Sequence, residues 1–242
     1  MPVLLRDAWT TVVPDMKDRH GPLPPLMLAL TVATGLIDAF SYLTLGHVFV
    51  ANMTGNVVFS GFAIAGAPEF SLSASLAALG AFATGALLGG WIAHRAAADR
   101  GRLLHRALVL ETILVAVAYV IAQTADPSRD AVRYPLIVLL GLAMGVQNAA
   151  ARTLAVPDLT TTVLTLTITG IASDSHIAGG AGSRAGRRVL SAAAMFLGAL
   201  IGALAVLHGH QSLPLLLATV LLAAVTVATF TLTRSGRAWT QP

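Results

Sequence analysis

Long apolar blocks alternate with short polar links along the whole chain. The blocks cover residues 24–45, 47–66, 72–94, 106–123, 134–152, 157–172, 189–207 and 213–233. Most of them are about twenty residues long, the length of an α-helix that crosses the hydrocarbon core of a bilayer. The pattern therefore predicts an all-α polytopic membrane protein.

The charges in the links predict which blocks cross the membrane. Residues 94–106 carry four arginines and residues 183–188 carry three more, whereas residues 66–70 and 208–212 contain no lysine or arginine. Because cytoplasmic links are rich in lysine and arginine, we expect the first two links and both termini on the cytoplasmic side. Six crossings satisfy this orientation. The second and sixth blocks are then expected to enter and leave the membrane on one side.

Composition excludes several classes of protein. Hydrophobic residues make up 56% of the 242 residues and charged residues only 11%, about half the charged share of a soluble domain. The chain has no cysteine, so disulfides and thiolate metal sites are excluded. The net charge of +4 comes without a basic stripe interleaved with aromatic residues, so we expect no nucleic-acid partner. Residues 4–13 suit a short interfacial helix better than a signal peptide.

The two halves of the chain resemble each other. At an offset of 106, residues 35–58 match residues 141–164 at five positions, and the sequence GALLG is followed later by GALIG. Three crossings in each half would invert the second half relative to the first, as in many transporters. We predict an inverted 3+3 transmembrane repeat with a re-entrant or broken helix in each half. The expected parts are an amino-terminal interfacial segment (1–22), a first repeat (23–123), a second repeat (133–233) and a cytoplasmic tail (234–242).

Two polar stretches within the apolar blocks are the candidate solute site. Residues 50–58 read VANMTGNVV and residues 157–162 read PDLTTT, and each looks like the start of a helix. Two half-helices that start inside the membrane would point their positive ends at a shared cavity. The predicted substrate-binding residues are Asn52, Thr54, Gly55, Asn56, Asp158, Thr160 and Thr162. The alternative is that these side chains only cap short helices and bind neighbouring helices.

Further polar residues lie within the predicted spans. Asp38 is near the middle of its block, where a carboxylate is expensive, so we expect a proton- or cation-coupling role or a buried partner. Gln147 and Asn148 correspond to Ser41 and Tyr42 at the offset of 106, and they are added to the substrate-binding set, although structural bonds would explain them equally well. Glu111 follows two basic residues and is expected to anchor the interface.

Small residues form a face on two predicted helices. Gly85 and Gly89 have the spacing that lets helix backbones approach closely, and Gly198 and Gly202 repeat it. We expect these faces to pack the two halves together, or to join subunits of a homo-oligomer.

The motifs also carry a family resemblance. The stretch GLIDAFSYLTLGHVFVANMTGNVV together with GLAMGVQNAAARTLAVPDLTTTVLT resembles the signature of the YoaK-like family of bacterial inner-membrane proteins, over roughly residues 25–233. The resemblance implies about six membrane spans and the bacterial inner membrane. It implies no substrate.

Three classes of function remain open at this point. The first is a secondary transporter of a small solute, with alternating access and Asp38 as the coupling group. The second is a channel lined by the two half-helices, and the third is a membrane scaffold or sensor. No motif of a known enzyme class is present, so we expect no enzymatic activity, no cofactor and no metal. The expected partners are the bilayer and a small solute.

Overall fold

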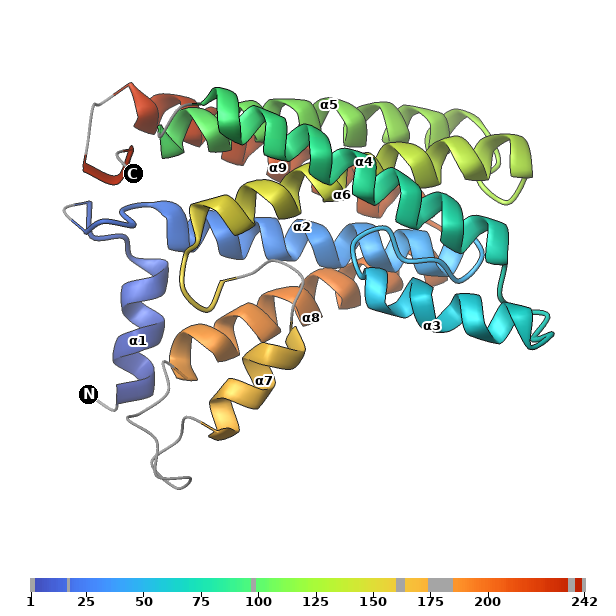
Figure 1. Ribbon diagram of the computed structural model, residues 1–242, viewed down its shortest axis with the longest axis horizontal. Helices are drawn as coiled ribbons and strands as arrows, with labels where there is room; N and C mark the ends of the chain where they lie inside the picture. Colours follow the sequence, from blue (N-terminus) through green and yellow to red (C-terminus); the bar gives the residue numbers. More distant parts are fainter. Residues whose placement is uncertain are drawn as a thin grey trace.

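The computed structural model describes residues 3–16, 18–96, 99–159, 164–173, 185–234 and 238–240. These parts of the chain are helical, and the long helices run roughly side by side (Figure 1). The helices are α1 (Val3–Val12), α2 (Leu23–Thr44), α3 (Met53–Ile64), α4 (Leu72–Arg95), α5 (Arg100–Thr124), α6 (Asp130–Leu154), α7 (Leu164–Ser173), α8 (Ala185–Leu207), α9 (Leu213–Thr233) and the 3-10 turn η2 (Ala238–Thr240).

Length and hydropathy separate the helices into two kinds. Within the described residues, α2, α4, α5, α6, α8 and α9 are long and apolar enough to cross a membrane, each with 21 to 25 residues. The two blocks that were expected not to cross contain α3 with 12 residues and α7 with 10. At 1.5 Å per residue the described parts of these helices reach about 18 and 15 Å, less than a core about 30 Å thick. The all-helical, six-span architecture is therefore confirmed, while re-entrant insertion of α3 and α7 stays a prediction.

The six long helices form two groups of three. Helices α4, α5 and α6 pack together, and α2, α8 and α9 pack together. Each group thus combines helices from both halves of the sequence. The groups meet mainly where α5 packs on α9, with a smaller contact between α2 and α6. Short helix α3 lies on α4, and both α1 and α7 lie on α8.

Glycines create the closest contacts inside each group. A Cβ added at Gly85 of α4 would lie 2.8 Å from both the Cα and the carbonyl carbon of Leu142 on α6. In the other group, a Cβ at Gly198 of α8 would overlap the backbone of Val32 on α2. Such close backbone approach is how helices associate in lipid, where the hydrophobic effect between helices is absent. The predicted packing role of the glycine faces is confirmed within the chain.

These contacts give a register for the helices α2 and α6 that differs from the predicted one. Gly85 contacts Leu142 as Gly198 contacts Val32, and residues 142 and 32 are 110 apart. A Cβ added at Gly89 would meet Ala149, and one added at Gly202 would meet Ala39, again 110 apart. The offset of 106 is therefore wrong for this helix pair by four residues, about one helical turn.

The corrected register has a better sequence match and a consequence for the polar residues. At an offset of 110, residues 25–39 share six identities with residues 135–149, including the pair Gly35 and Gly145. Asn148 then corresponds to Asp38, whereas the predicted pairing of Asn148 with Tyr42 is wrong. The inverted repeat itself stays a prediction.

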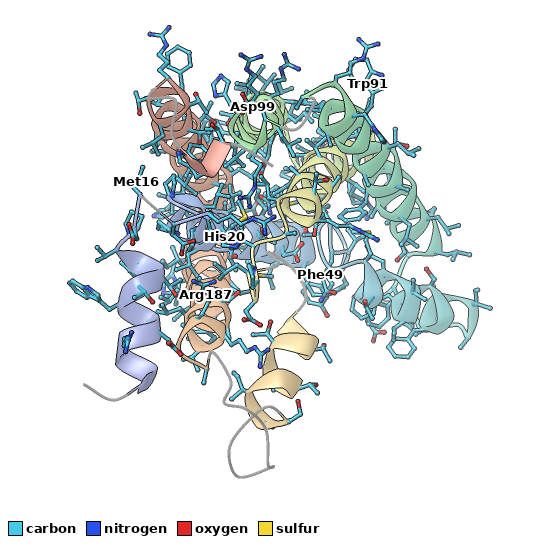
Figure 2. The ribbon with its side chains drawn as sticks, turned by 60° about the vertical axis from the view of Figure 1, so that its left-hand side comes forward. Met16, His20, Phe49, Trp91, Asp99 and Arg187 are labelled. Carbon is cyan, nitrogen blue, oxygen red and sulfur yellow. The ribbon has the colours of Figure 1, made fainter. Side chains whose placement is uncertain are left out.

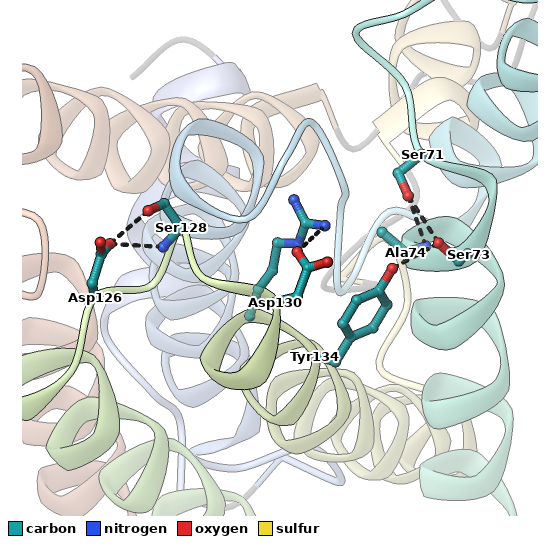
Figure 3. Close-up of polar contacts among 8 residues, drawn as sticks. Ser71, Ser73, Ala74, Asp126, Ser128, Asp130 and Tyr134 are labelled. Carbon is teal, nitrogen blue, oxygen red and sulfur yellow. Dashed lines mark hydrogen bonds and ion pairs between the residues drawn. The ribbon is translucent and has the colours of Figure 1, made fainter.

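Different contacts hold the two ends of the bundle. At the end opposite the termini, the hydroxyls of Ser73 and Tyr134 are 2.6 Å apart and join the starts of α4 and α6 (Figure 3). At the end where both termini lie (Figure 1), Trp239 of the carboxyl-terminal turn is fully buried. Its side chain packs on Gly21, whose φ of +44° and close neighbour both disfavour a larger residue.

Candidate functional site

Asp38 holds the segment that leads into α3. Its side chain is 4% exposed, and Oδ1 accepts hydrogen bonds from the backbone N–H groups of Val50 and Ala51, at 3.1 and 2.9 Å. These N–H groups directly precede the start of α3, where a negative charge is favourable. Asp38 thus acts as a cap supplied by α2. Asn52 occupies the N-cap position, as predicted, but its own side chain forms no capping bond.

The other predicted residues of the first stretch differ in their surroundings. Asn52 and Thr54 are exposed on the protein surface. Asn56 is fully buried, and its amide binds the backbone N–H and carbonyl of Phe49 at 3.0 and 2.6 Å. A Cβ added at Gly55 would lie 2.7 Å from the Phe49 ring. Asn56 and Gly55 therefore fix the loop before α3, and Asn52 and Thr54 are the two that a solute could reach.

The second stretch differs from its predicted form. Asp158 was expected to cap a helix; the described part of α7 covers Leu164–Ser173. Instead, Asp158 adopts a left-handed φ of 62° and forms an ion pair with Arg188 of α8, with 2.8 Å between Oδ1 and Nε. The N-cap assignment of Asp158 is wrong, because its φ is left-handed and the next residue, Leu159, is not helical. Thr160 and Thr162 lie outside the described residues, so the predicted cavity between the two stretches stays a prediction.

Gln147 and Asn148 lie next to each other on α6, and Gln147 contacts α2. The Gln147 amide nitrogen donates a hydrogen bond of 2.8 Å to the Thr34 hydroxyl, and Gln147 is 2% exposed. This bond connects the two groups of helices. Asn148 donates to the carbonyl of Met144 on its own helix at 2.8 Å.

Glu111 is the largest departure from expectation at the candidate site. It was predicted to anchor the membrane interface, but its side chain is 1% exposed, and within the described residues neither carboxyl oxygen has a hydrogen-bond partner. Glu111 lines a narrow gap that is too small to hold a water molecule, bounded by Met27 and Leu30 of α2 and by Gln147 of α6. The Gln147 side-chain oxygen also has no partner among the described residues.

This gap lies where the two groups of helices meet. Glu111 belongs to one group of helices, Met27 and Leu30 belong to the other, and Gln147 bonds across to Thr34. An ionised carboxylate in such surroundings costs several kcal/mol unless a cation or hydrogen-bond donors accompany it. A protonated Glu111 would instead donate its hydroxyl to a neighbouring acceptor. Glu111 is therefore a titratable group buried between the two groups of helices.

The fold defines the chain as a multi-pass helical membrane protein. A family model described as "Protein of unknown function (DUF1275)" matches residues 26–228, and the chain belongs to this family. Over 150 residues it is 33% identical to the UPF0700 transmembrane protein YoaK of Bacillus subtilis (strain 168); this stretch covers 62% of the chain and 65% of that protein, just under two thirds of its length. No solved structure matches. The resemblance drawn from the sequence motifs is confirmed.

Proposed function

We propose that the protein is a secondary transporter in which the two groups of helices rock against each other and a proton on Glu111 controls their contact. The observation that carries the proposal is the buried carboxyl group of Glu111 where the groups meet, which has no hydrogen-bond partner among the described residues. The protein would move a small solute across the bacterial inner membrane without chemical conversion, with both termini in the cytoplasm.

The packing inside and between the groups supports rigid-body movement. Inside each group, glycine contacts such as Gly85 on Leu142 bring the backbones together, so the helices of a group would move as a unit. Between the groups, the described residues form isolated polar contacts. They include the Gln147–Thr34 bond and a 3.1 Å contact between the hydroxyls of Thr112 on α5 and Thr226 on α9. Packed interfaces of this kind favour discrete arrangements over continuous deformation.

Glu111 is a better coupling group than Asp38. Asp38 uses one carboxyl oxygen to bind the backbone before α3, so its protonation would loosen that segment before it moved a helix group. The Glu111 carboxyl group forms no hydrogen bond with any of the described residues. A proton on Glu111 would permit the closed contact seen here, and its loss would introduce a charge that favours a wetter, opened interface. Asp38 would instead hold α3 so that Asn52 and Thr54 face the solute path.

Accessibility of the α3 start tests this proposal. Because the chain has no native cysteine, Thr54→Cys can be probed with an impermeant thiol reagent from each side of sealed membrane vesicles. We expect reaction from both sides, with Glu111→Gln increasing the rate on one side and decreasing it on the other. Exposed Leu87→Cys on the lipid-facing part of α4 is the matched control and should not respond to Glu111→Gln.

The alternatives predict different results. A channel with a fixed pore would let Thr54→Cys react from both sides with rates that Glu111→Gln changes together or not at all. A scaffold would allow reaction from one side at most. Either pattern would refute alternating access.

A further inference from the structure

A cavity lies at the end of the bundle where both termini are found, away from Glu111. Its volume is about 440 Å³, within the range of small-ligand sites. It is formed where the link before α2, the turn between α4 and α5, and the end of α6 come together. Figure 2 shows this end brought forward, with His20 between Asp99 and Arg187. The lining residues used below are Arg19, His20, Ala93, Ala96, Asp99 and Arg100.

Arg100 builds the wall of this cavity through uncharged acceptors. Its guanidinium donates to the backbone carbonyls of Arg19 and Leu154 at 2.9 and 2.7 Å, and it lies 3.2 Å from Nδ1 of His20. Within the described parts of the chain, no carboxylate forms an ion pair with Arg100 or with Arg19. The acidic lining residue Asp99 is already paired with Arg102 at 3.1 Å. The cavity therefore carries uncompensated positive charge.

The pKa of His20 reflects the same excess of positive charge. Burial lowers the pKa of its imidazole from the ordinary value, and the charges of Arg100, Arg187 and Arg19 lower it further, while Asp18 raises it. The positive charges together thus outweigh the carboxylate of Asp18. An anion placed in the cavity would offset this repulsion.

The depth of the cavity relates it to the membrane surface. Trp91 of α4 is 54% exposed, and the Arg95 guanidinium lies 4.0 Å from its ring centroid. Exposed tryptophan together with arginine is typical of the level of lipid headgroups. Of the residues that line the cavity, Ala93 belongs to the last turn of α4 and Ala96 is its C-cap. The cavity therefore opens close to the headgroup region.

We propose that this cavity binds a phosphate group, and that in the membrane the phosphate is supplied by the headgroup of an anionic phospholipid. Arginine binds phosphate through strong charge-assisted hydrogen bonds, and basic pockets at the ends of membrane helices favour acidic lipids. Arg19 and His20 contact the phosphate, while Arg100 holds the wall. The small apolar side chains of Ala93 and Ala96 accommodate the glycerol end of the lipid. This site is independent of the transport proposal.

The test measures thermal unfolding of the full-length protein in a neutral detergent by tryptophan fluorescence. Titration with phosphatidylglycerol should raise the melting temperature, because a ligand that binds only the folded state stabilises it. Phosphatidylcholine at the same mole fraction and soluble glycerol phosphate should have little effect. A shift with glycerol phosphate equal to that with phosphatidylglycerol would overturn the lipid source in favour of a soluble phosphorylated ligand. An equal shift with phosphatidylcholine would overturn the anion site altogether.

Matched variants assign the effect to the cavity. Arg19→Gln should weaken the apparent affinity for phosphatidylglycerol about tenfold, the effect of one lost hydrogen bond to a charged group. Arg234→Gln removes the same charge at the same end of the bundle, next to Thr233 that packs on Gly101, and should have a clearly smaller effect. Arg19 is exposed, so its substitution leaves the fold intact. Equal weakening in both variants would show general attraction to the surface and refute the site.

Discussion

The glycine contact between α4 and α6 gives the sharpest prediction about stability. In Gly85→Ala, the new Cβ would lie 2.8 Å from two backbone carbons of Leu142. Carbon atoms pack at about 3.5 to 4.0 Å, so the helices must separate by about 1 Å or bend locally. Overpacking by one methyl group costs about 1 to 3 kcal/mol, and the neighbour here is backbone, which cannot turn aside as a side chain would.

Gly90→Ala on the same helix is the matched control. A Cβ at Gly90 would meet nothing within 4 Å. Both substitutions gain the same helix propensity, up to about 1 kcal/mol, so their difference isolates the contact. At about 2 to 4 °C per kcal/mol, a difference of about 2 kcal/mol predicts a gap of about 4 to 8 °C in melting temperature in detergent. Equal melting temperatures for Gly85→Ala and Gly90→Ala would refute close packing of α4 on α6.

Three further predictions concern the polar residues and the topology. Asp38→Ala should destabilise the protein by about 2 to 4 kcal/mol in chemical denaturation, because two backbone N–H groups lose their acceptor, and Asp38→Asn should cost less; equal costs would contradict the capping role. His20 has a lowered pKa in the folded state, so stability should fall as the pH drops through 6.5 without bound anion, and His20→Gln should flatten this dependence in melting curves; an unchanged slope would contradict it. Impermeant thiol reagents should label His210→Cys only from outside and Arg102→Cys only from inside the cell; the reverse would overturn the orientation.

The spans could be predicted from the sequence because crossing a membrane depends on length and hydropathy, which are properties of the chain itself. The block that ends in α9 was predicted to the residue, 213–233. The α4 block was predicted within one residue of its observed end, Arg95. The short helices α3 and α7 were also found in the two blocks expected not to cross. These features need no knowledge of neighbouring helices.

Glu111 was misjudged because the start of its helix was misplaced. The apolar block was read from residue 106, which put Glu111 near the surface. The helix begins at Arg100, so Glu111 lies about 16 Å along it, too far for its carboxyl group to reach water. The arginines in the first turns of α5 made this segment look like a link outside the membrane. Arginines at a helix end can extend toward the interface while their helix continues into the membrane.

The register of the two halves and the role of Asp158 were both predicted incorrectly. The offset of 106 matched polar residues near Thr54, whereas the contacts of Gly85 and Gly198 align the helices at 110. Asp158 carries a typical capping residue type, but its partner Arg188 comes from a helix 30 residues later. The partner of Asp158 does not follow from local pattern, because it requires the position of α8. The match at 110 is present in the sequence, but most of it precedes residue 35, where the comparison at 106 began.

Distances between spin labels test the central claim, movement of the two helix groups, most directly. One pair, Arg152→Cys with Val189→Cys, reports on α6 and α8 at the end that holds the termini, and another pair, Arg129→Cys with Leu207→Cys, reports on the opposite end; all four positions are exposed and the chain has no native cysteine.

Pulsed electron–electron double resonance in lipid nanodiscs should show two distance populations for each pair. A change of pH should shift the populations in opposite directions at the two ends, and Glu111→Gln should abolish that response. A single distance population at both ends that does not change with pH would contradict alternating access and with it the role of Glu111.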